Sequence, residues 1–187
     1  MDLTRIKNLV PDYARDLKLN LASVLSPEGA PGLNETQILA TALASSVAAR
    51  NLSLLREIEA LVAGKLDGAQ ANAARAAAAI MGMNNVYYRF THLVGNDEYA
   101  KLPAKLRMNV IGNPGIDKTD FELYSLAVSA INGCGACIAS HEHVVRKAGV
   151  SAEGVQSAVR IAAVIHGIAV AVEAAAAAGR EVDAAAA

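Results

Sequence analysis

The chain has 187 residues, of which 53% are hydrophobic, 4% aromatic and 19% charged, and its formal net charge is −1. Much of the hydrophobic fraction is alanine, the best helix former, so the composition favours an all-α fold with closely packed helices. A nearly neutral chain without a block of basic residues is poorly suited to nucleic acid or to an anionic membrane surface. The length suits one compact domain over residues 1–187.

The first half of the chain predicts four helices. The first is expected over residues 3–18, with Pro11 kinking or restarting it. A loop rich in Pro and Gly follows at 26–32, and either Asn34 or Thr36 can cap the next helix. Apolar spacing and alanine content then predict the other three helices, over residues 34–46, 52–63 and 68–90.

The second half begins with a connector over residues 96–119, where prolines and charges allow at most short helices. Thr119 or Asp120 is expected to cap a helix that ends near residue 131. A segment with both cysteines follows, and Gly149 is expected to end its helix. Ser151 can cap the last long helix, which is predicted to end near residue 174.

The longest uncharged stretch, residues 123–140, approaches the length of a membrane span. It contains polar residues and both cysteines, so we interpret it as a buried helix followed by a functional segment. Charged residues interrupt the start of the chain, and no signal peptide is expected there. Two cysteines without a larger disulfide framework suit a reducing cytoplasm.

The pair Cys134 and Cys137 is the strongest functional signal. Two intervening residues on a helical turn place the sulfurs on one face, with Cα atoms roughly 5 Å apart, which suits a disulfide. Asn132 and Gly133 can interrupt the preceding helix, so that Cys134 starts a new one. Backbone N–H groups at a helix start favour a thiolate, which suits redox chemistry.

Three other interpretations of the cysteines remain. A structural disulfide would close a very short loop and add at most roughly 2 kcal/mol of stability. Two buried, unreactive thiols are a second possibility, because free cysteine packs as a small hydrophobe. A zinc site built from Cys134, Cys137, His141 and His143 is the third, although one helix would turn His143 away from the other ligands.

His141 and Glu122 are candidate partners of the thiols. His141 lies four residues after Cys137, so on a continuous helix its imidazole can accept the thiol proton. Glu122 falls in a stretch predicted to be buried, where a carboxylate needs a histidine or a water as partner. An equally good interpretation is a first-turn charge favoured by the helix dipole. The two other histidines, His92 and His166, have no chemical partner in sequence and are expected to be structural.

An internal repeat is suggested by two similar runs, RAAAAIMGM at 75–83 and RIAAVIHGI at 160–168. The halves would be about 35–95 and 119–178, with cysteines only in the second. Alanine-rich helices also resemble each other by chance, so these residues alone leave the duplication open.

Several motifs together resemble the alkyl hydroperoxidase D proteins (AhpD-like) of the carboxymuconolactone decarboxylase-like superfamily. They are NPGI at 113–116, FEL at 121–123, SAINGC at 129–134, HEH at 141–143, MGMNNVYYR at 81–89 and LRMN at 106–109. The resemblance covers nearly the whole chain. It implies an all-α fold with two similar halves and a homotrimer.

The resemblance also implies a function. Such proteins reduce the disulfide of a peroxiredoxin, alkyl hydroperoxide reductase C (AhpC), with electrons from dihydrolipoamide on a lipoylated 2-oxoacid dehydrogenase component. They bind no cofactor of their own and have weak direct peroxidase activity. The alternatives are a stand-alone alkyl hydroperoxidase, a carboxymuconolactone decarboxylase-like enzyme, and a non-catalytic zinc or assembly module.

Carried over by position, the resemblance assigns four catalytic residues. Cys137 would be the buried thiol, His141 its base, and Glu122 a proton relay acting through water. Cys134 would be the more exposed thiol and would form the mixed disulfide with AhpC. Better-known relatives carry a histidine where this chain has Ala136, so any contribution from that histidine is absent here.

Overall fold

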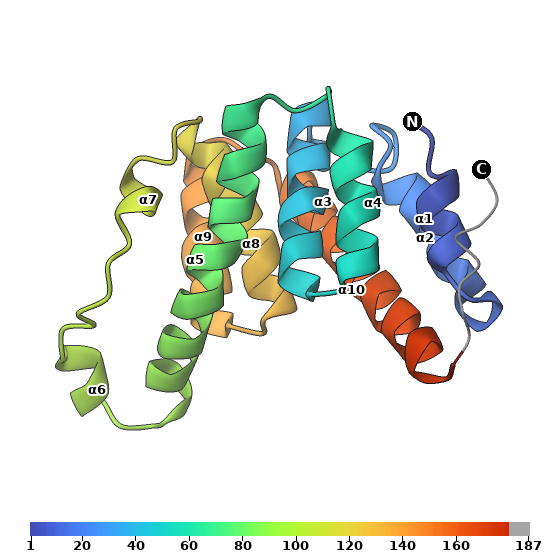
Figure 1. Cartoon of the computed structure of the whole chain (residues 1–187). Helices are drawn as coiled ribbons and strands as arrows, with labels where there is room; N and C mark the ends of the chain where they lie inside the picture. The colour runs from blue at the N-terminus through green and yellow to red at the C-terminus, as the bar shows by residue number, and fades with distance from the viewer. Residues whose placement is uncertain (180–187) are drawn as a thin grey trace.

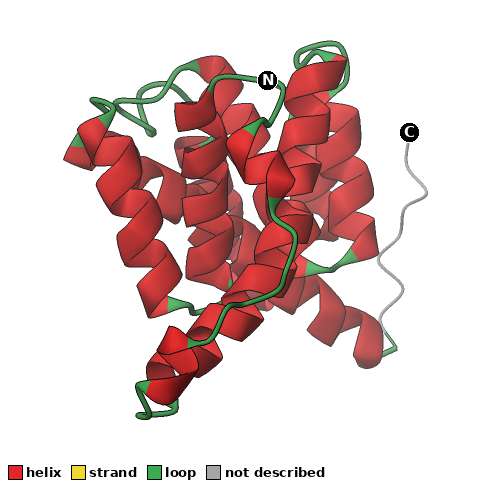
Figure 2. Ribbon diagram, turned by 90° about the vertical axis from the view of Figure 1, so that its left-hand side faces the viewer, coloured by secondary structure: helices red, strands yellow, loops and turns green. Residues whose placement is uncertain are grey.

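The computed structural model describes residues 1–179, which form helices and loops with no strand among them (Figures 1 and 2). The all-α prediction is confirmed. In chain order the helical elements are α1 (Thr4–Leu9), the 3-10 turn η1 (Asp12–Ala14), α2 (Arg15–Val24), α3 (Glu35–Ala49), α4 (Leu52–Val62), α5 (Gly68–Leu93), α6 (Glu98–Lys101), α7 (Asn109–Gly112), α8 (Lys118–Ile131), α9 (Gly135–Lys147) and α10 (Ala152–Ala177).

Helices α3 and α8 form the centre of the molecule. Each has an unbroken run of buried residues, 38–46 in α3 and 121–129 in α8. A helix that is buried all round must be covered by neighbours on every side. Accordingly, α3 contacts α4, α5, α8 and α10, and α8 also contacts α5, α9 and α10. The predicted burial after residue 123 is confirmed, and Glu122 lies inside this core.

Helix α10 is the one helix in residues 1–179 that is long and apolar enough to cross a membrane by length and composition. Half of its most apolar window is buried inside the molecule. It packs against α2, α3 and α8, with its buried residues on one side. This is the pattern of a core helix whose other side faces outward.

Two predicted boundaries are wrong. The helix expected over residues 3–18 restarts after Pro11, as predicted, but its second part, α2, continues to Val24 and does not end near residue 18. Neither Thr119 nor Asp120 caps α8; the cap is Asp117, whose carboxylate accepts the backbone N–H of Thr119 at 2.7 Å. Asp117 directly precedes the first residue of α8, so its carboxylate can accept the free backbone N–H groups of the first turn.

The other caps follow the sequence. Asn34, not Thr36, caps α3 in a capping box with Gln37, and Ser151 caps α10. Gly149 follows α9 with a φ of +99°, a backbone conformation that suits glycine.

The helices of the two predicted halves occur in the same order of length. α3, α4 and α5 have 15, 11 and 26 residues, and α8, α9 and α10 have 14, 13 and 26. A duplication would produce this correspondence, and it stays a prediction. Between the halves, the end of α5 and the short helix α6 form an arm that extends away from the bundle (Figure 1), and α7 contacts α5 and α8 again.

Candidate redox site

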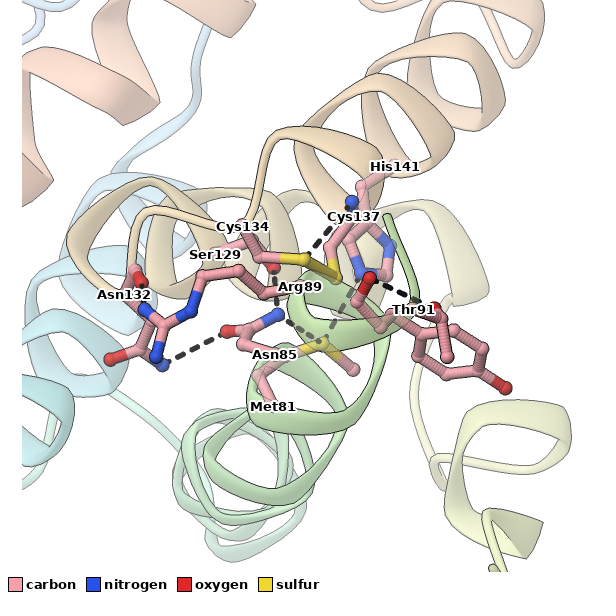
Figure 3. Close-up of a disulfide and its surroundings, with 10 residues drawn as sticks. Met81, Asn85, Arg89, Thr91, Ser129, Asn132, Cys134, Cys137 and His141 are labelled. Carbon is pink, nitrogen blue, oxygen red and sulfur yellow. Dashed lines mark hydrogen bonds between the residues drawn. A yellow bond between two sulfur atoms is a disulfide. The ribbon is translucent and has the colours of Figure 1, made fainter. Parts of the chain in front are cut away.

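Cys134 and Cys137 are joined in a disulfide at the junction between α8 and α9 (Figure 3). Their Cα atoms are 5.3 Å apart, as the spacing predicted. The chain leaves α8 at Ile131 and turns through Gly133, whose φ is +67°. That left-handed conformation is the one that glycine adopts without steric cost. The turn places Cys134 directly before α9.

Cys134 is the N-cap of α9. Its Sγ accepts the backbone N–H of Cys137 at 3.3 Å. The predicted position of Cys134 at a helix start is therefore confirmed. Free N–H groups and the positive end of the helix dipole stabilise negative charge there. A thiolate released at Cys134 would meet a hydrogen-bond donor already in place.

The exposure of the two cysteines is the reverse of the expectation. Cys134 is 0% exposed and Cys137 is 7% exposed. A cavity of about 310 Å³ is lined by Cys137 and not by Cys134. The expectation that Cys134 is the more exposed thiol is wrong, because α5 packs beneath α8 and α9 at this junction. Of the two cysteines, Cys137 is the one that lines the cavity.

His141 and Glu122 form a buried pair beside this cavity. His141 Nδ1 lies 2.6 Å from Glu122 Oε2, and both residues line the cavity with Cys137. The side chains are only 11% and 6% exposed. A carboxylate accepts hydrogen bonds, so Nδ1 donates to it and Nε2 is the nitrogen left for proton exchange. The pairing confirms that Glu122 needs a partner. The contact is direct, and a relay of protons from Glu122 through water stays a prediction.

The sequence did not predict the contribution of α5 to this site. Met81 Sδ lies 3.2 Å from His141 Nε2, so the thioether packs against the nitrogen left for proton exchange. Asn84 lines the cavity, is 4% exposed, and its Oδ1 has no hydrogen-bond partner among residues 1–179. The remaining lining is largely apolar. It consists of Tyr88, Met108, Ile111, Ala136, Ser140 and Val144.

The other histidines lie apart from the cysteines. His143, His92 and His166 are exposed. Within the described part of the chain, no group of three or more His, Cys, Asp or Glu side chains is placed to hold a metal ion. The zinc alternative therefore has no ligand cluster in residues 1–179.

Comparison with known proteins agrees with the site. A family model described as the carboxymuconolactone decarboxylase family matches residues 97–180. Three proteins named alkyl hydroperoxide reductase AhpD are similar over nearly their full lengths. The one from Rhodopseudomonas palustris is 54% identical over 95% of this chain and 96% of its own. The one from Rhodospirillum centenum is 55% identical (95% and 94%), and the one from Brucella suis 53% (94% and 98%). The chain therefore belongs to the alkyl hydroperoxide reductase AhpD family.

Proposed function

We propose that this protein is an antioxidant thiol-disulfide oxidoreductase that carries electrons from dihydrolipoamide to a peroxiredoxin of the AhpC type. The observation that supports this most is the disulfide beside a buried histidine–carboxylate pair, at a cavity lined by Cys137, His141 and Glu122. The names of the relatives place hydroperoxide reduction in the same family. The cysteines carry the electrons themselves, so no bound cofactor is needed.

In the first step, a thiolate of the donor attacks Cys137 Sγ from the cavity. The Cys134–Cys137 bond breaks, and Cys134 leaves as a thiolate that accepts the N–H of Cys137. Exchange is faster when the leaving thiolate is stabilised. The second donor thiol gives its proton to His141 and attacks the donor sulfur of the mixed disulfide. This releases Cys137 Sγ, which takes that proton from His141, and leaves the donor as a cyclic disulfide.

In the second step, the reduced cysteine pair reduces the disulfide of the partner peroxiredoxin by the same exchange chemistry. His141 accepts the proton of Cys137, and the Glu122 carboxylate stabilises the imidazolium that forms. The Cys137 thiolate attacks one sulfur of the peroxiredoxin disulfide and forms an intermolecular bond. The partner disulfide breaks, and its other sulfur leaves as a thiolate that takes the proton from His141. Cys134 then attacks Cys137 Sγ, restores the internal disulfide and releases the reduced partner. Two electrons pass in each half of the cycle, and one proton passes through His141.

The position of the mixed disulfide separates this scheme from the one that the resemblance implied. The resemblance puts the partner on Cys134, whereas the exposure of the sulfurs favours Cys137. In our scheme, the Cys134→Ser variant traps the peroxiredoxin covalently and the Cys137→Ser variant does not. The reverse result on a non-reducing gel would assign the partner to Cys134.

The function itself is tested by NADH oxidation with lipoamide, lipoamide dehydrogenase, a peroxiredoxin and a hydroperoxide. The wild-type protein is expected to support turnover, and Cys137→Ser to abolish it. Rapid peroxide consumption with a simple thiol and no peroxiredoxin would show a stand-alone alkyl hydroperoxidase. Activity that survives replacement of both cysteines would show a carboxymuconolactone decarboxylase-like enzyme.

We also propose a cytoplasmic homotrimer, without a nucleic-acid or membrane partner. The arm formed by the end of α5 and by α6 carries several large apolar side chains that are exposed in the single chain. They are Val86, Phe90, Leu93, Tyr99 and Leu102. Large exposed apolar patches are typical of contacts between subunits. Light scattering after gel filtration should give the mass of three chains, and a monomeric mass would contradict the trimer.

A further inference from the structure

One face of α5 holds the turn that carries the cysteines (Figure 3). Met81, Asn85 and Arg89 are spaced four residues apart, so their side chains follow one face of the helix. All three contact the segment from α8 to α9. They belong to the run MGMNNVYYR, for which the sequence indicated no role.

Arg89 fixes the backbone of the turn. Its Nη1 donates to the carbonyl oxygen of Asn132 at 2.6 Å. Asn132 follows the last residue of α8, where free carbonyl groups and the helix dipole favour a cation. Arg89 makes no ion pair with a carboxylate within residues 1–179, so its charge is directed to the end of this helix.

Asn85 fixes the same turn through side chains. Its Nδ2 donates to Ser129 Oγ and its Oδ1 accepts from Asn132 Nδ2, both at 2.9 Å. Asn85 is only 1% exposed and its bond to Ser129 is buried, so water competes little with that bond, whereas the bond to Asn132 is partly buried. Asn132 is therefore held by both its carbonyl and its side chain, two residues before Cys134.

We propose that Arg89 and Asn85 are positioning residues for the redox pair. By holding Asn132, they keep Cys134 at the start of α9 when the disulfide is open. The two thiols then stay close together, which raises their effective concentration and favours the disulfide. In the oxidised state the covalent bond holds the sulfurs in any case. Loss of these hydrogen bonds should therefore relax mainly the dithiol, and so make the disulfide easier to reduce.

The test is equilibration with glutathione, in which two glutathione thiols reduce the Cys134–Cys137 disulfide and form glutathione disulfide. For Arg89→Met we expect the equilibrium constant to move about tenfold toward the dithiol, which corresponds to about 30 mV. Arg89→Lys can still donate to the carbonyl oxygen of Asn132, so its equilibrium constant should lie between those of wild type and Arg89→Met. Asn132→Ala removes one side-chain bond and should shift the constant two- to threefold.

Arg75→Met is the matched control, because Arg75 also lies on α5. The substitution removes the ion pair between Arg75 and Glu59 (2.6 Å), which does not contact the turn. Its constant should stay within twofold of wild type. The proposal is overturned if Arg89→Met also stays within twofold. Should Arg89→Met fail to fold, an unchanged constant in folded Asn132→Ala overturns it.

The positioning role of Arg89 and Asn85 rests on the redox function proposed above. The glutathione equilibration, however, uses no protein partner. The two proposals can therefore fail separately. If the glutathione equilibrium constant shifts in Arg89→Met but the wild-type protein passes no electrons to a peroxiredoxin, the proposed function is wrong and the positioning role still holds.

Discussion

The pair formed by Glu122 and His141 gives the sharpest prediction. Glu122→Gln replaces the buried carboxylate with an amide of the same shape, 2.6 Å from His141 Nδ1. The amide oxygen can still accept the Nδ1–H, so the imidazole keeps its place. The negative charge that stabilises the imidazolium is lost. Proton transfer by a positioned side chain contributes at least about 10²-fold to rate, so we expect turnover to fall about 10²-fold.

Stability should respond differently to the two partners. Glu122→Gln keeps a hydrogen bond and should cost about 1 kcal/mol. His141→Leu leaves a carboxylate that is 6% exposed without its partner, which should cost about 3 kcal/mol or more. The double variant Glu122→Gln/His141→Leu no longer buries an unpaired charge and should be more stable than His141→Leu alone. Urea unfolding measures the three stabilities, and the lipoamide-coupled assay measures turnover.

Two results would refute this reasoning. Turnover of Glu122→Gln above one third of wild type would show that the carboxylate does not support proton transfer. A His141→Leu variant as stable as Glu122→Gln would show that the buried carboxylate does not depend on the imidazole. The control is Arg75→Met, which breaks an ion pair on the same scaffold away from the cavity.

Three further predictions each concern a single residue. Burial raises the pKa of the Tyr124 hydroxyl, which has no partner among residues 1–179, so Tyr124→Phe should raise Tm by about 2–4 °C in a thermal scan. Gly133→Ala forces alanine into a φ of +67° and should lower the free energy of unfolding by about 1 kcal/mol in urea. Asn84→Leu removes a polar group from the cavity and should raise KM for dihydrolipoamide about fivefold, with the fold intact by circular dichroism. Each prediction is contradicted if its measured quantity does not change: the Tm of Tyr124→Phe, the free energy of unfolding of Gly133→Ala, or the KM of Asn84→Leu.

Local rules predicted much of the fold and of the site. Helix periodicity brought Cys137 and His141 to one face, and the spacing of the cysteines predicted their Cα separation. Burial around Glu122 followed from the apolar run that begins at Phe121. Each of these relations holds within one helix, or between a helix and its cap, so the residues alone were sufficient.

The relations between helices could not be predicted in this way. Met81, Asn84 and Arg89 lie more than 40 residues before the cysteines, and only the packing of α5 against α8 and α9 brings them to the site. The same packing covers Cys134, which local sequence cannot show. The sequence contains one signal of this contact, the four-residue spacing that puts Met81, Asn85 and Arg89 on one face of a helix. On an alanine-rich helix, such a spacing is hard to separate from ordinary packing.

The two sulfurs differ because each depends on a different neighbour. Cys134 is buried and faces the N–H groups of α9, so it is suited to leave as a thiolate and to return to Cys137. Cys137 lines a cavity with His141, so it is suited to meet a partner sulfur and to exchange a proton. Ala136 also lines this cavity, and it adds no second base where some relatives carry a histidine. In the proposed scheme, proton transfer at Cys137 therefore depends on His141, and the efficiency of the pair depends on how firmly Asn132 holds Cys134 in place.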